Sequence, residues 1–144
     1  KRTTSVTKYY DDLINSIGEK DIDSKKRKLY LTLVSINILE GIRFYVSFAC
    51  AYAMAQNKKM EGNAKIIKFL ARDENTHLDA TTTMIKKMLE EDKDFVKIAK
   101  EKEKEVVRLF TNVIEQEKEW AKYLFRNGSM IGLNETILNQ YIES

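Results

Sequence analysis

The sequence has no proline, only five glycines, and a single histidine, cysteine and tryptophan. Proline breaks helices and glycine weakens them, so their scarcity leaves long helices uninterrupted and provides few turns. Lysine, glutamate, leucine, isoleucine and alanine are plentiful. We therefore predict an all-α fold. At 144 residues and 43% hydrophobic composition, the chain is long enough for one domain with a core and too short for two.

No charge of one sign dominates either, because 25 basic and 22 acidic side chains leave a net charge of +3. This balance argues against nucleic acid as a partner. The single Cys50 cannot form an internal disulfide, which fits a reducing compartment. The longest apolar run, about Tyr45 to Ala55, is shorter than the ~20 residues of a membrane span, and no signal peptide opens the chain. We therefore expect a cytoplasmic protein without a membrane partner.

Helix signals divide the chain into long segments joined by short linkers. The expected helices run from about Thr4 to Ser16, from the Asp23–Ser24 cap to about Gln56, from about Met60 to Glu90, from Asp94 to the Asn127–Gly128 turn, and from about Asn134 onward. Short linkers make long neighbouring helices pack antiparallel, as in a helical bundle. The chain starts without methionine and ends inside an amphipathic stretch, so we expect residues 1–144 to form a single partial domain of a longer protein.

The one histidine follows an acid at helical spacing, in the motif Glu74-x-x-His77. Side chains three residues apart on a helix point about 60° apart, so these two can bind one metal ion or two adjacent ions. Apolar or small residues continue the same helical face, namely Ile67, Leu70, Thr81 and Met84. The acid and the histidine therefore occupy a stripe where a core would normally be apolar.

A second acid, Glu40, lies on the preceding predicted helix, in an apolar stripe with Leu33, Ile36, Phe44 and Phe48. A buried, unpaired carboxylate is costly, and coordination to a cation removes that cost. Two carboxylates and an imidazole suit iron or manganese, and di-metal helical bundles use one such set from each half. Two other interpretations stay open: Glu74-x-x-His77 is a common surface motif, and Glu40 could pair with Arg43 or Arg72.

Four stretches carry a more specific pattern: Leu39–Phe48, Glu61–Ile67, Ala71–His77 and Tyr123–Asn134. Together they resemble the radical-generating small (beta) subunit of class I ribonucleotide reductase, over about Lys28 to Asn134. The resemblance implies a ferritin-like helical fold and a di-iron centre whose oxidation by O₂ makes a stable tyrosyl radical. That radical is passed to the large catalytic subunit, which reduces ribonucleotides to deoxyribonucleotides for DNA synthesis.

The resemblance also implies roles for particular residues. Glu40, Glu74 and His77 match the ligands that mainly serve the second iron. Three apolar side chains match the pocket beside the radical tyrosine, namely Phe44, Phe48 and Ile67. Asp73 matches an acid that orients the ligands and joins the hydrogen-bonded radical path. The family's other three ligands, its radical tyrosine and its radical-path tryptophan come from preceding helices, so we expect no catalytic residue in this chain.

Three functional hypotheses follow. In the first, the chain is part of the reductase small subunit, inactive alone, and its partners are the N-terminal remainder of that subunit, a second small subunit and the large catalytic subunit. In the second, two copies complete a ferritin-like di-metal site across a homodimer. In the third, the chain is a non-enzymatic helical interaction fragment. The ligand types suit iron, manganese or a mixed pair.

Overall fold

The computed structural model of the chain describes residues 4–143, and the ends of the predicted domain at 1–3 and 144 lie outside that range. Its helices are α1 (Thr4–Asn15), α2 (Ile22–Ile38), η1 (Leu39–Arg43), α3 (Phe44–Gln56), α4 (Glu61–Glu91), α5 (Lys93–Leu124) and α6 (Glu135–Glu143). Within the described residues there is no β-strand, only an isolated bridge between Met130 and Leu133. The predicted all-α class is confirmed.

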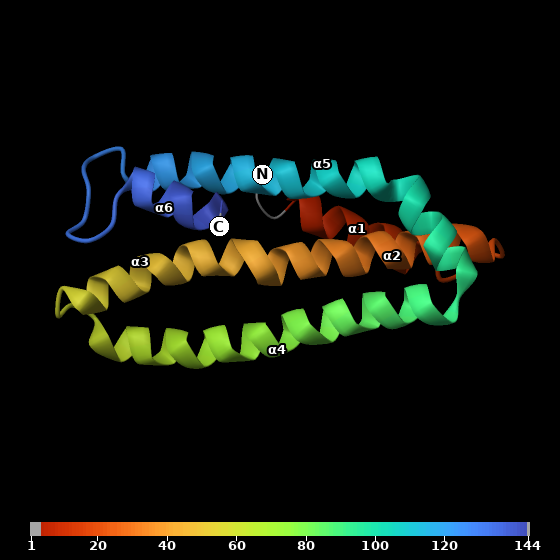
Figure 1. Cartoon of the computed structure of the whole chain (residues 1–144), viewed down its shortest axis with the longest axis horizontal. Coiled ribbons are helices and arrows are strands. Elements are labelled where there is room, and N and C mark those ends of the chain that lie inside the picture. The colour runs from red at the N-terminus through yellow and green to blue at the C-terminus, as the bar shows by residue number, and fades with distance from the viewer. Residues whose placement is uncertain (1–3, 144) are drawn as a thin grey trace.

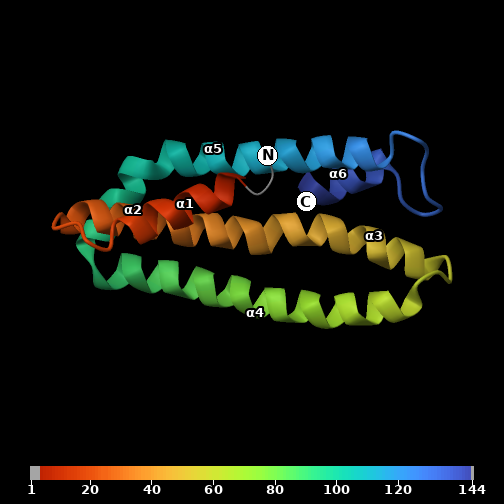
Figure 2. The same cartoon turned by 180° about the vertical axis from the view of Figure 1, so that it is seen from behind.

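The central element is a continuous rod of 35 residues, Ile22–Gln56, made of α2, η1 and α3. Each of the helices α1, α4, α5 and α6 packs against it. In Figures 1 and 2 the rod lies between α5 on one side and α4 on the other, and α4 and α5 run the length of the molecule. Helices joined by short linkers are antiparallel, as predicted: α4 runs opposite to the rod, and α5 runs opposite to α4 and therefore parallel to the rod.

Two apolar clusters hold the neighbours on the rod. One joins α2 to α5 and includes Tyr30, Leu31, Val34, Ile38, Phe95, Ile98 and Val113. The other joins α3, α5 and α6 and includes Val46, Ala53, Ala121, Leu133 and Leu138. Burial of such side chains is the main favourable contribution to folding, at roughly 25 cal/mol per Å² of apolar surface.

By length and composition alone the rod is apolar enough to cross a membrane. The longest run of consecutive apolar residues within it, about Tyr45 to Ala55, is still shorter than the ~20 residues of a membrane span. The central helix of a helical bundle meets the same criterion. The neighbouring helices bury 33% of the most apolar window of the rod.

The turn after α3 falls at the polar break Asn57–Lys59, as the sequence predicted. Lys58 and Met60 adopt positive φ values of 56° and 53°, which reverse the chain direction within a few residues. The Asn57 amide donates to the Ala53 carbonyl and to the Ile131 carbonyl, both at 2.8 Å. This turn is thereby tied to the loop that follows α5.

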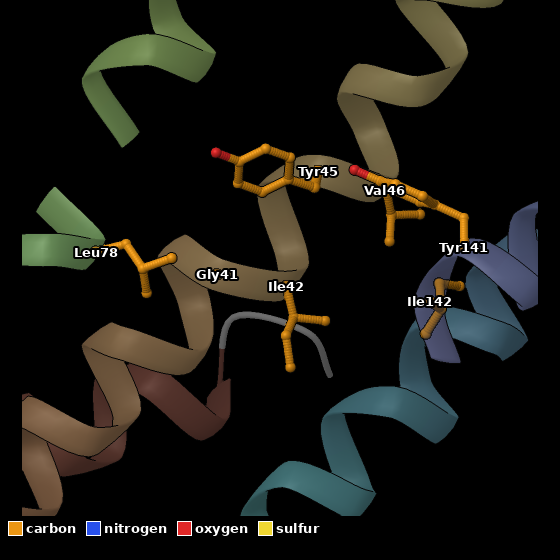
Figure 3. Close-up of a pocket in the computed structure, with 7 residues that line it drawn as sticks. All are labelled: Gly41, Ile42, Tyr45, Val46, Leu78, Tyr141 and Ile142. Carbon is orange, nitrogen blue, oxygen red and sulfur yellow. The ribbon is translucent and has the colours of Figure 1, made fainter. Parts of the chain in front are cut away.

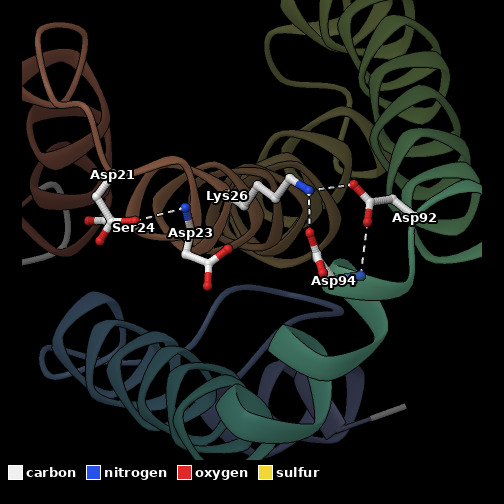
Figure 4. Close-up of polar contacts among 6 residues, drawn as sticks. All are labelled: Asp21, Asp23, Ser24, Lys26, Asp92 and Asp94. Carbon is white, nitrogen blue, oxygen red and sulfur yellow. Dashed lines mark hydrogen bonds and ion pairs between the residues drawn. The ribbon is translucent and has the colours of Figure 1, made fainter.

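At the opposite end, Lys26 joins α2 to the turn between α4 and α5 (Figure 4). Its ammonium lies 2.7 Å from Asp92 Oδ2 and 2.6 Å from Asp94 Oδ2. Asp92 also caps α5 by accepting a hydrogen bond from the Asp94 backbone N–H at 2.8 Å. The cap of α2 is Asp21 rather than the predicted Asp23–Ser24, because its carboxylate accepts from both of those backbone N–H groups.

Replacing Lys26 by Met should lower the midpoint of thermal unfolding by a few degrees at neutral pH. The hydrogen bond with Lys26 holds the pKa of Asp92 below its usual 3.8, and the two aspartates raise the pKa of Lys26 above 10.5. The Lys26 ion pairs therefore contribute their whole stabilisation between pH 3.8 and pH 10.5. This stabilisation is lost as the pH falls through the lowered pKa of Asp92 or rises through the raised pKa of Lys26.

The measurement compares thermal unfolding of wild type and Lys26→Met at about pH 7 and about pH 2, with the exposed Lys86→Met as control. The difference between wild type and Lys26→Met should shrink at the lower pH. An equal difference at both values would show that the carboxylates of Asp92 and Asp94 contribute nothing through Lys26.

Candidate metal centre

The candidate centre begins with an irregularity in the rod. Leu39–Arg43 forms a π-helical turn, and Glu40 is its second residue. The sequence predicted an unbroken helix here, so this prediction was wrong in detail. A π-turn inserts one residue into the helical repeat and re-aims the side chains around it, and such turns are frequent at functional sites. An acid inside an apolar stripe was the one local signal of it.

Gly41 lets the π-turn lie close to α4. A Cβ at this position would lie 3.2 Å from Leu78 Cδ1, closer than ordinary van der Waals contact. Figure 3 shows Leu78 of α4 facing the Gly41 backbone. The close approach brings the Glu40 carboxylate to the helix that carries Glu74 and His77.

The structure brings the three predicted ligands together. Donor atoms of Glu40, Glu74 and His77 all lie within 4.8 Å of one another. His77 Nδ1 is 3.9 Å from Glu40 Oε1 and 3.6 Å from Glu74 Oε2. The two carboxylates are largely buried, with side chains 14% and 18% exposed, whereas the imidazole is 58% exposed. Two acids and one imidazole at this spacing can share a cation.

One carboxylate oxygen of Glu40 shows how the three side chains fit a cation. Its Oε2 is buried and has no hydrogen-bond partner among the described residues. Burial raises the pKa of Glu40, the neighbouring His77 lowers it, and the Glu74 carboxylate raises it further. The donor set therefore fits a cation, because coordination would satisfy the buried oxygen and remove the repulsion between the two acids.

Neither arginine considered as a partner for Glu40 pairs with it in this structure. The Arg43 side chain reaches α5, where it contacts Gln116 and Glu117. The Arg72 guanidinium lies 3.8 Å from the Asp73 carboxylate. Glu40 instead faces His77, with Oε1 3.9 Å from His77 Nδ1.

Polar contacts from two residues of the rod, Asn37 before the π-turn and Tyr45 after it, fix the register of α4. The Asn37 amide donates to Thr81 Oγ1 at 3.0 Å and to Thr82 Oγ1 at 2.9 Å. The Tyr45 hydroxyl donates to the Asn75 side chain and to the Ala71 carbonyl. A shift of α4 by one residue would break both sets, so they hold Glu74 and His77 opposite Glu40.

The aromatic residues expected beside the centre lie on α3, directly after the π-turn. Phe44 and Phe48 stack with ring centroids 6.3 Å apart, and Phe48 is buried. Ile67 on α4 is half-buried. Asp73 is exposed, and its carboxylate lies 3.8 Å from the Arg72 guanidinium.

One side of the centre is open. The stripe on α4 was expected to be buried, yet Leu70 and Met84 are exposed along with His77. A pocket of about 390 Å³ lies beside the π-turn, between α4 and α6 (Figure 3). It is lined by Gly41, Ile42, Tyr45, Val46, Leu78, Tyr141 and Ile142. Thr81 in the same stripe is buried against the rod, so the open part consists of Leu70, Met84 and the His77 imidazole, where further ligands have room to approach.

Comparison with known proteins agrees with the geometry. The sequence matches the family described as ribonucleotide reductase, small chain, over residues 1–144, beyond the Lys28–Asn134 stretch of the predicted resemblance. The chain belongs to this family. It is 49% identical to the ribonucleoside-diphosphate reductase subunit beta of Buchnera aphidicola, 48% to that of Haemophilus influenzae, and 46% to the ribonucleoside-diphosphate reductase 1 subunit beta of Escherichia coli O157:H7.

Each of these alignments covers 99% of this chain and 43% of the relative, so the chain spans less than half the length of the curated relatives it matches. Two solved structures share the fold. One, from Bacillus halodurans and described as a class I ribonucleotide reductase, has a TM-score of 0.83 and 25% identity over 98% of this chain and 47% of that one. The other, a ribonucleotide reductase R2 subunit from Clostridium botulinum, has a TM-score of 0.80 and 29% identity, over 98% and 41%. The predicted ferritin-like fold is confirmed.

Replacing Glu40 by Gln should stabilise the metal-free protein at neutral pH, because it removes a charge that burial disfavours. The pKa of Glu40 is raised above its usual 4.5, so the ionised acid costs stability at pH values above that raised pKa. The difference from wild type should shrink as the pH falls and vanish below 4.5, where the acid is protonated in both folded and unfolded states.

Thermal unfolding in the presence of a chelator measures this effect, with the exposed Glu90→Gln on α4 as the matched control. A Glu40→Gln variant that unfolds at a lower temperature than wild type at neutral pH would show that the carboxylate is already satisfied without metal.

Proposed function

We propose that this chain provides the second-metal half of the di-metal centre in a class I ribonucleotide reductase small subunit. The observation that carries the proposal is the convergence of Glu40, Glu74 and His77 within 4.8 Å, on two helices of a chain that belongs to this family. The buried, unpartnered Oε2 of Glu40 supports a cation at that point.

In this proposal the largely buried carboxylates of Glu40 and Glu74 would hold the cation together with the more exposed imidazole of His77. Carboxylate and imidazole ligands suit iron, manganese or a mixed pair. Di-metal bundles take a Glu from each of two helices and a Glu-x-x-His from each of two others. This chain supplies one of each, so the remaining ligands come from elsewhere.

The bound metals would supply the oxidising chemistry that generates the radical used in reducing ribonucleotides to deoxyribonucleotides. The chain's own residues serve that chemistry by shaping its surroundings. Phe44, Phe48 and Ile67 form an apolar wall that excludes water and other groups able to quench a radical. Asp73 is accessible on the exposed side of α4. There its carboxylate would accept a hydrogen bond from a metal ligand or from a residue of the radical path.

The exposed residues of α4 indicate which partners this half of the centre needs. The N-terminal remainder of the small subunit would cover the exposed stripe of α4 and supply the missing ligands. The completed subunit would pair with a second copy and dock on the large catalytic subunit, in the cytoplasm. Relatives named ribonucleoside-diphosphate reductase subunit beta support this assignment.

Metal titration tests the proposal on the small subunit in which this chain is completed. We expect two iron or manganese ions per subunit, and loss of at least one with Glu74→Ala or His77→Ala because each removes a ligand. Nucleoside diphosphate reduction in the presence of the large subunit should fall in parallel. The control is Glu90→Ala, an exposed acid on the same helix.

The same titration on the 144-residue chain alone separates the alternatives. Binding of two metals by a dimer of this chain would favour a symmetric di-metal protein. Unchanged metal content and unchanged reductase activity in both ligand variants would leave only a non-enzymatic helical fragment.

A further inference from the structure

The π-turn ends at Arg43, whose side chain is buried on the α5 side of the rod. Arg43 and Glu117 are the buried charged residues in the described part of the chain, with side chains 4% and 0% exposed. Arg43 Nη2 donates to Gln116 Oε1 at 2.8 Å, and Nη1 lies 3.6 Å from Glu117 Oε1. A buried arginine with these two contacts is held at a defined position.

Glu40 and Arg43 belong to the same turn but reach opposite neighbours. On a regular α-helix, residues three apart point about 60° apart and would face the same side of the rod. Here Glu40 contacts His77 on α4, whereas Arg43 contacts Gln116 and Glu117 on α5. The rod lies between these two helices in Figures 1 and 2. The wider π-turn is what allows both contacts at once.

Apolar packing around Arg43 is incomplete. A cavity of about 60 Å³ lies beside its side chain, lined by polar residues such as Ser35 and Asn112 as well as apolar ones. The polar contacts with α5 therefore define where the guanidinium sits. Returning the turn to a regular α-helix would move Arg43 away from Glu117 and leave two buried charges apart, which is strongly unfavourable.

We propose that Arg43 is a positioning residue for the metal centre: its contacts with Gln116 and Glu117 hold Leu39–Arg43 in the π form and so fix the Glu40 carboxylate beside Glu74 and His77. The inference rests on the proposed function for the identity of the centre. It adds that the geometry of the second-metal site is set from α5, on the far side of the rod from the α4 ligands.

The test uses the completed small subunit and Mn²⁺ as the probe. Arg43→Met should weaken Mn²⁺ binding at this half of the centre at least tenfold and change the electron paramagnetic resonance spectrum of the bound ion. Lys26→Met is the matched control, because it breaks an ion pair at the end of the bundle. It should lower the unfolding temperature and leave affinity and spectrum unchanged.

Arg43→Met removes the guanidinium from beside the buried Glu117 carboxylate and could prevent folding, so the double variant Arg43→Met/Glu117→Met decides the matter. It buries no unpaired charge and should fold, yet bind Mn²⁺ weakly with an altered spectrum. A folded double variant with wild-type affinity and spectrum would overturn the proposal and reduce the Arg43–Glu117 pair to a structural contact.

A crystal structure of the metal-free double variant tests the inference independently of metal. We expect a regular α-helix through Leu39–Arg43, with the Glu40 carboxylate displaced from His77. A π-turn that persists unchanged would overturn the proposal. If the unsubstituted subunit bound neither iron nor manganese, the proposed function would fail, and this crystal structure alone would decide the role of Arg43.

Discussion

The arrangement around the candidate centre depends on one carboxylate, that of Glu40, which lies in an apolar rod and pairs with neither Arg43 nor Arg72. Ionised acids avoid such surroundings unless an opposite charge satisfies them. The π-turn directs this acid toward α4, and Gly41 lets α4 come close enough for Glu74 and His77 to reach it. In the proposed function, this loss of stability is the cost of keeping a cation-binding site at Glu40.

The surrounding contacts keep this unfavourable group in place. Asn37 and Tyr45, on either side of the π-turn, contact α4, and Arg43 contacts α5 on the other side of the rod. Apolar clusters on either side of the π-turn supply most of the folding energy. The centre is therefore built on rigid helices, as a metal site that must hold its ligands at fixed distances requires.

Much of this could be predicted from the sequence, because helix ends and ligand spacing are local properties. The scarcity of proline and glycine predicted the long helices, and Glu74-x-x-His77 with Glu40 predicted the ligands that the structure brings together. The π-turn could not be predicted, since one inserted residue hardly disturbs the apolar periodicity. The contact between Arg43 and Glu117 could not be predicted either, because the packing of whole helices determines which residues distant in sequence meet.

Anomalous scattering at the iron and manganese absorption edges, measured on metal-loaded crystals of the small subunit that contains this chain, tests the central claim most directly. The account predicts a metal peak bonded to Glu40, Glu74 and His77, with Glu40 still directed by the π-turn. A fully loaded subunit whose metal peaks lie elsewhere, with these three side chains unbound, would contradict it.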